Sequence, residues 1–256
     1  MHLQHRLNSS SLVVLLQQWT RDDCRRAPPQ DVAEQLSRWL DAVDSIRLSR
    51  ALHAVGALPS EGAQLGPVLD AQAMDAVFQG AKAEVMGLIT AAIATAKPMR
   101  GRADHVSGSH PEPQLSTDPA ALVQRYVGLQ KQMDAKLAAL RSHMRQWLSR
   151  GPVALRQLAA LDAVMEQMLS AREQRLWASL PGHLERRLAQ LHQLHQQALQ
   201  ASGQADEPQR WRQPGGWLWL FEQDLQALLL AEMQVRLQPI TGLLEAARNE
   251  KSGQQE

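Results

Sequence analysis

The feature that most constrains this chain is a set of apolar stripes with helical spacing in its second half. From residue 119 to residue 149, large apolar side chains recur at steps of three and four. At about 100° per residue, these side chains stay on one narrow face of a helix. The members of this stripe are Leu122, Tyr126, Leu129, Met133, Leu137, Leu140, Met144 and Trp147. Such a stripe is buried only when other helices pack against it, so we expect a helical bundle.

Further stripes of the same kind follow to the end of the chain. The pair Gly151-Pro152 ends the first helix and begins the next, and Pro239 is expected to kink the last one. The segment SLPGH at 179–183 has two interpretations, because a proline either breaks a helix or is absorbed as a kink. We favour the first, in which the chain folds back and four helices pack together. These predicted helices are 119–149, 152–179, 182–200 and 217–248.

The composition of the chain also indicates helices. Leu, Ala, Gln, Arg and Met dominate, aromatic residues make up 4%, and the β-branched and aromatic runs typical of strands are missing. Before the first stripe, helices are expected at 11–19, 31–43, 45–55 and 67–96. The predicted fold is all-α: an elongated helical bundle with coiled-coil-like packing, preceded by a smaller helical N-terminal region.

The longer of two breaks in composition divides the chain, and the shorter one lies at 202–216. The stretch 97–118 is poor in large apolar residues and rich in Pro, Gly, Ser and charge, which is typical of a flexible linker. We therefore predict an N-terminal helical region at 1–96, a linker at 97–118 and a C-terminal helical bundle at 119–256.

Charge and cysteine content argue against several classes of protein. The formal net charge is +1, and the arginines of 185–187 and 210–213 are too sparse for a basic stripe, so no nucleic-acid partner is expected. The single cysteine, Cys24, excludes an internal disulfide and fits a reducing compartment.

The apolar runs at 12–16 and 227–231 are too short to span a bilayer, and the first residues lack the architecture of a signal peptide. We expect a cytoplasmic protein with no membrane span.

The chain carries no recognisable catalytic or cofactor motif. It has no Walker loop, dinucleotide-binding fingerprint, nucleophile elbow or paired Cys-x-x-Cys. No cofactor is therefore expected, and a non-enzymatic role is favoured over an enzymatic one.

Two histidines stand three apart in the segment AQLHQLHQ at 189–196. His195 falls within the apolar stripe and His192 at its edge. A metal pair at this spacing usually has a carboxylate companion, as in Glu-x-x-His, whereas the neighbours here are glutamines. We predict a packed, hydrogen-bonded histidine at 195 beside a solvated one at 192, and no metal.

Three carboxylates share a helix face beside the second stripe: Asp162, Glu166 and Glu173. Carboxylates directed into a bundle hold two metal ions in ferritin-like proteins, but those sites use Glu-x-x-His on two helices, and this chain has no such sequence. We expect these carboxylates to form salt bridges or to face water. A metal-binding or hydrolytic bundle that uses this face stays open as the alternative.

Two charged residues fall inside apolar stripes, Arg172 and Glu232. Buried charges need partners. If the chain folds back at SLPGH, the two lie at similar depth and are expected to pair. If the helix continues through Pro181, Arg187 becomes the partner of Glu232 and Arg172 must find another acid. Asp224 and Arg236 complete the set of candidate buried polar or interaction residues.

Three segments carry a resemblance to a known family. They are LSRWLDAVDSIRLSRAL at 36–52, LAALDAVMEQMLSARE at 158–173 and FEQDLQALLLAEMQVRLQPITGLLEAAR at 221–248. Through them, and over most of its length except the linker, the chain resembles an uncharacterised bacterial family of unknown function. The resemblance implies no activity. It implies an accessory role in an envelope-linked assembly, because genes of this kind tend to lie near one for an envelope protein with a peptidoglycan-binding domain.

The sequence thus predicts a non-enzymatic helical interaction or scaffold protein. Its expected partner is another helical protein or a second copy of itself, bound through the helix seams. An envelope-anchored protein is the partner that the family resemblance implies.

Overall fold

The structure is a computed structural model that describes residues 10–20, 42–57, 70–94 and 119–253. Within these ranges the chain forms helices and no strand, which confirms the predicted all-α class. The helices are α2 (Ser11–Trp19), α4 (Ala42–Gly56), α5 (Ala71–Ala94), α6 (Pro119–Leu148), α7 (Val153–Ser202), the 3-10 turn η1 (Pro208–Arg210) and α8 (Trp217–Gly253). Nearly all of the helix predicted at 31–43 lies outside the described residues.

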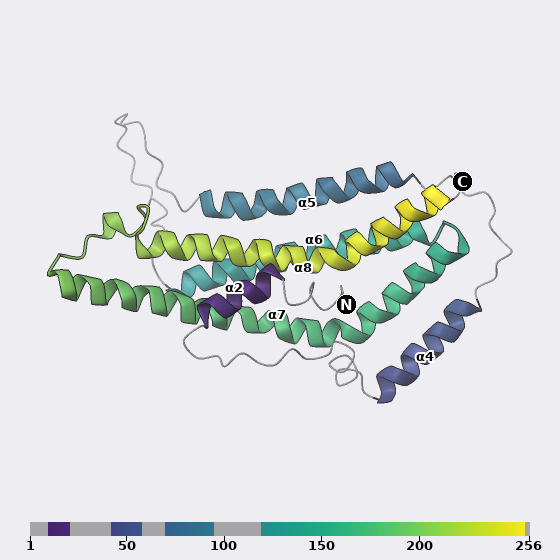
Figure 1. Cartoon of the computed structure of the whole chain (residues 1–256), viewed down its shortest axis with the longest axis horizontal. Coiled ribbons are helices and arrows are strands. Elements are labelled where there is room, and N and C mark those ends of the chain that lie inside the picture. The colour runs from purple at the N-terminus through teal and green to yellow at the C-terminus, as the bar shows by residue number, and fades with distance from the viewer. Residues whose placement is uncertain (1–9, 21–41, 58–69, 95–118, 254–256) are drawn as a thin grey trace, which may run out of the picture.

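Helices α5, α6, α7 and α8 pack side by side as a bundle, and α8 contacts the other three (Figure 1). The stripe predicted on α6 faces the interior: six of its members are buried, and Leu129 and Trp147 are partly buried against the core. The buried members are Leu122, Tyr126, Met133, Leu137, Leu140 and Met144. Burying one large apolar side chain contributes about 1.5–3 kcal/mol, so this stripe is a major source of the bundle's stability.

Helix α7 runs without interruption from Val153 to Ser202, with Pro181 inside it. The predicted fold-back at SLPGH is therefore wrong. The proline is absorbed instead, and α7 bends along its length (Figure 1). One long helix thus spans the region in which the sequence predicts two helices.

The connection between α7 and α8 is compact. Gly203 ends α7 in the left-handed conformation at φ 64° and donates its N–H to the carbonyl oxygen of Leu199. At the start of α8, the carbonyl oxygen of Trp211 accepts the N–H groups of Leu218 and Trp219 at 3.1 and 3.0 Å. A Cβ atom at Gly216 would lie 2.3 Å from this same carbonyl oxygen, so the close approach requires glycine.

The described N-terminal helices pack on the C-terminal ones. Helix α2 lies on α8, where Ser11 Oγ donates to Gln234 Oε1 at 2.7 Å, while α5 packs on α6 and α8, and α4 packs on α7. Leu12, Met74 and Phe78 belong to the same core cluster as α6, α7 and α8. The predicted linker lies outside the described residues, so the division at 97–118 stays a prediction, whereas the helices on its two sides share one core.

Helix α5 combines length with an apolar composition. Among the described helices it is the one long and apolar enough, over Ala71–Ile93, to cross a membrane. Its inner side, with Met74, Val85 and Ile89, packs in the core. Core helices of soluble proteins pass the same test of length and composition, so the predicted absence of a membrane span stays a prediction.

Candidate functional site

The centre of the bundle contains a fully buried carboxylate, that of Glu232 on α8, with 0% of the residue exposed. On α6, Tyr126 Oη donates to Glu232 Oε2 at 2.8 Å and Gln130 Nε2 donates to Glu232 Oε1 at 3.0 Å. Arg236, one turn along α8, donates to Oε1 from Nε at 3.0 Å and from Nη2 at 2.7 Å. The charge of Glu232 is thus compensated by a cation and by hydrogen bonds, which buried charges require.

The environment of Glu232 changes the acidity of its neighbour. Burial of the Tyr126 phenol, together with the adjacent carboxylate of Glu232, raises the pKa of Tyr126 far above its usual range. Tyr126 therefore stays a neutral hydrogen-bond donor in the folded protein at any ordinary pH.

The same site extends to α7. Gln130 Nε2 lies 3.2 Å from the carbonyl oxygen of Trp177, and the guanidinium carbon of Arg236 lies 4.3 Å from the centre of the Trp177 ring. Arg236 also contacts Asp134 of α6. One polar site therefore joins α6, α7 and α8.

The predicted carboxylate face of α7 is occupied by two arginines of α6. Asp162 accepts hydrogen bonds from Arg141 at 2.7 and 3.0 Å and from Arg145 at 3.1 Å. Glu166 accepts one from Arg145 at 2.5 Å, and the charge of Glu173 also acts on Arg141. The predicted salt bridges are thus present at Asp162 and Glu166. Cations at these oxygens oppose the binding of a metal ion there, and the described residues include no group of three potential metal ligands.

Arg172 and Glu232 are not partners. Because α7 is continuous, Arg172 pairs instead with Asp44 of α4, Nη1 to Oδ2 at 2.9 Å. The alternative prediction, a pair between Arg187 and Glu232, is also wrong. Arg187 donates to Asp224 of α8 at 2.7 Å, so the predicted residue Asp224 ties α7 to α8 by a different pair.

The two histidines lie near the connection to α8. His195 is half-buried, and its Nε2 lies 3.0 Å from Oδ1 of Asp206. The indole of Trp211 donates to the same Oδ1 at 2.7 Å, and these hydrogen bonds, first from Trp211 and then from His195, hold the pKa of Asp206 below its usual value. His192 is exposed, and the centre of its ring lies 5.2 Å from the centre of the Trp217 ring in an edge-on arrangement. His195 is thus hydrogen-bonded as predicted, although at the rim of the core.

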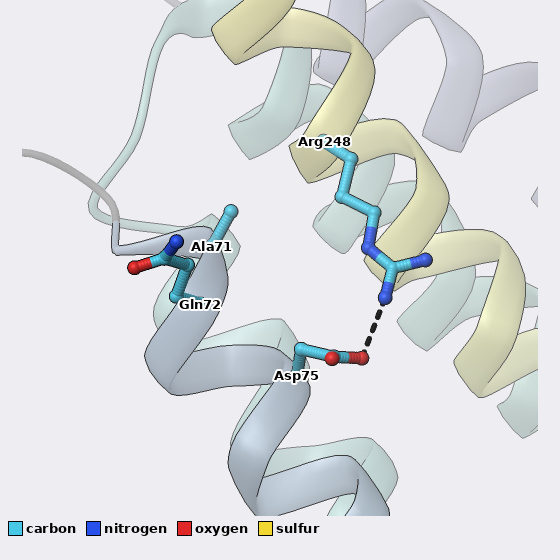
Figure 2. A pocket seen from close by; sticks show the side chains of 4 residues that line it. All are labelled: Ala71, Gln72, Asp75 and Arg248. Carbon is cyan, nitrogen blue, oxygen red and sulfur yellow. Dashed lines mark hydrogen bonds and ion pairs between the residues drawn. The ribbon is translucent and has the colours of Figure 1, made fainter.

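A shallow hollow lies between the start of α5 and the end of α8 (Figure 2). It is lined by Ala71, Gln72, Asp75 and Arg248. Arg248 Nη2 donates to Asp75 Oδ1 at 2.5 Å across it, so the charged groups of the hollow bind each other. This arrangement stabilises the contact between two helices.

Three important partners were absent from the predicted site: Asp44, Gln130 and Trp177. The sequence does place Tyr126 in the apolar stripe of α6. Because a buried phenol needs a hydrogen-bond partner, this position was a signal for a contact with the buried Glu232. Pro181 also gave a signal, because a proline leaves the carbonyl group four residues earlier without its helical donor.

These contacts define the class of protein: an all-α bundle in which charged side chains at the core and its rim tie neighbouring helices together. The chain belongs to the DUF3348 family of proteins of unknown function, whose family model matches residues 2–249. This membership confirms the resemblance to an uncharacterised family. No curated protein and no solved structure matches the chain.

Proposed function

We propose that the protein is a non-enzymatic helical interaction or scaffold protein. The observation that carries this proposal is the outer side of α4. Two large apolar residues of this side are more than half exposed, Val43 at 56% and Ile46 at 54%. Apolar side chains exposed together on one short helix are typical of a surface that binds another protein.

The inner side of α4 is already occupied. Asp44 is buried and pairs with Arg172, and Gln157 Nε2 of α7 donates to the carbonyl oxygen of Val55 at 3.1 Å. These two contacts, near the two ends of α4, fix the helix on α7. The exposed apolar side chains are therefore presented from a helix that is held in place, which lowers the entropic cost of binding.

The alternative, a metal-binding or hydrolytic bundle, relies on the carboxylate face of α7. The arginine pairs at Asp162 and Glu166 count against it, since those oxygens already bind cationic groups. We therefore retain the interaction function. Its proposed setting is cytoplasmic, in an envelope-linked assembly, which the resemblance to a bacterial family supports.

Photo-crosslinking from α4 in cells of the native host tests the proposal. A crosslinking amino acid at Ile46 should give a discrete product of higher mass with another protein or a second copy. Leu194 on α7 is 53% exposed and serves as a matched control, because it is equally accessible but far along the chain from α4. Equal labelling from both positions, or no product from position 46, would refute the proposed function.

A further inference from the structure

The outer face of α4 has the spacing of one half of a two-helix seam. Val43, Ile46, Arg50 and His53 follow one another at steps of three, four and three, and all four are exposed. At about 100° per residue they lie within about 80° of one another around the helix. Steps of three and four are the spacing with which side chains of one helix fill the gaps of a second.

A cation lies at the centre of this seam. Arg50 is one turn from Ile46 and forms no ion pair with any residue that the structure describes. Arg47 lies beside the seam with 65% of its side chain exposed, and its nearest carboxylate, Asp44, lies 4.0 Å away and is engaged by Arg172. Asp44 is also the single acidic residue of α4. The exposed face is therefore apolar and positively charged.

This charge pattern selects the partner. A second copy of α4 would bring arginines and no exposed carboxylate, so pairing of two α4 helices would place like charges together. A helix with apolar side chains at the same spacing and with glutamate or aspartate opposite Arg50 would satisfy both features. Helices that lie on membranes usually insert Trp, Phe or Leu, whereas this seam offers Val and Ile alone, which disfavours a lipid surface.

We propose that the outer face of α4 binds an acidic amphipathic helix of another protein, with a carboxylate of that helix paired to Arg50. This inference rests on the proposed interaction function and specifies the chemistry of the partner. The polar anchors at Asp44 and Val55 hold the face ready for binding, and Arg50 selects for an acidic partner.

A pair of synthetic peptides tests the proposal on the full-length protein. One is a labelled amphipathic helix of about three heptads with leucine seam positions and glutamate flanks, and the other has lysine in place of glutamate. Fluorescence anisotropy should show binding of the acidic peptide and not of the basic one. The variant Arg50→Glu should weaken binding of the acidic peptide at least about tenfold and bind the basic peptide better than the wild type does. Arg150→Glu, at an exposed arginine after α6, is the matched control and should leave both affinities unchanged.

The other occupants give different results. Equal effects of Arg50→Glu and Arg150→Glu would overturn the role of Arg50. Binding to vesicles that contain phosphatidylglycerol, lost in Arg50→Glu, would assign the face to a membrane instead. A dimer in sedimentation that Ile46→Asp dissociates would assign it to a second copy. If crosslinking from position 46 still captures a partner but the acidic peptide does not bind, the acidic helix is wrong while the interaction function stands. If both experiments fail, both proposals fail.

Discussion

The side-chain amide of Gln130 donates to the carbonyl oxygen of Trp177 at 3.2 Å, and this carbonyl is the one that Pro181 leaves without a helical donor. The same nitrogen lies 3.0 Å from Oε1 of Glu232. A gap in the hydrogen bonding of α7 and a buried charge on α8 are thus satisfied by one residue of α6. The contact therefore fixes how three helices sit along one another.

A double-mutant cycle between Gln130 and Pro181 tests this relationship. Gln130→Leu should lower the free energy of unfolding by about 1–3 kcal/mol, because it leaves buried acceptors short of a donor. Pro181→Ala restores a backbone N–H for the Trp177 carbonyl, so the same loss should be smaller in that background by about 0.5–1.5 kcal/mol. Urea unfolding of the four proteins measures the coupling.

Pro239 provides the matched control for this cycle, since it lies inside α8 in the same way. Pro239→Ala should combine additively with Gln130→Leu. Additivity for Pro181 as well would show that the amide does not substitute for the missing helical hydrogen bond.

The buried phenol of Tyr126 predicts a loss of stability at alkaline pH. Its folded pKa is raised above the ordinary value of 10.0 by burial and by Glu232. A group with a raised folded pKa contributes stability that is fully present below its unfolded pKa and is lost as the pH rises beyond it. The free energy of unfolding should therefore fall above about pH 10. Tyr126→Phe should remove much of that fall, at a cost of about 1–2 kcal/mol near neutral pH.

Ionisation of this residue can be followed directly, because Tyr126 is the one tyrosine of the chain. Phenolate absorbance should stay absent in the folded protein and appear together with unfolding. An absorbance change near the ordinary pKa with the helices intact would contradict the buried contact to Glu232.

The stripes of the second half were sufficient to predict the class of fold and the burial of α6. Periodicity reports which face of a helix is apolar, and this holds whether or not a proline lies within it. The course of the chain at Pro181 could not be predicted in the same way. A kink is favoured over a break when another helix supplies a hydrogen-bond donor to the carbonyl oxygen that the proline leaves without one. That donor, Gln130, lies 51 positions earlier in the chain and has no feature of its own that marks it.

The charged partners show the same limit. The sequence places Arg172 and Glu232 in apolar stripes and so predicts that each needs a partner. Which partner each finds depends on the register between helices. Because the predicted course of α7 is wrong, the sequence assigns Arg172 to Glu232 in place of Arg236. The same error leaves Asp44 out as the partner of Arg172.

The corrected pairs predict independent effects of Arg172 and Glu232. Glu232→Leu removes a buried ion pair and two hydrogen bonds from α6, so it should cost about 3–5 kcal/mol. Arg172→Met should mainly release α4, because Asp44 is its partner. The two losses should add within about 0.5 kcal/mol, since the residues share no partner. Hydrogen exchange should speed up in α4 for Arg172→Met and not in α6, and a coupling above this limit would restore the rejected pair.

The last prediction concerns the connection between α7 and α8 at low pH. Hydrogen bonds from the Trp211 indole and then from His195 lower the pKa of Asp206 below its ordinary value of 3.8. A carboxyl group with a lowered folded pKa contributes stability above its unfolded pKa, and this contribution is lost as the pH falls toward the folded pKa. Urea unfolding at stepped pH should therefore show an acid loss below about pH 4 that is smaller in Asp206→Asn. Glu207→Gln, which changes the neighbouring exposed carboxylate, is the control and should keep the wild-type dependence. His195→Leu should reduce the acid loss less than Trp211→Phe does, because the indole makes the larger contribution to the pKa shift. If Asp206→Asn and Glu207→Gln show the same acid loss of stability, the hydrogen bonds of Asp206 do not stabilise the connection between α7 and α8.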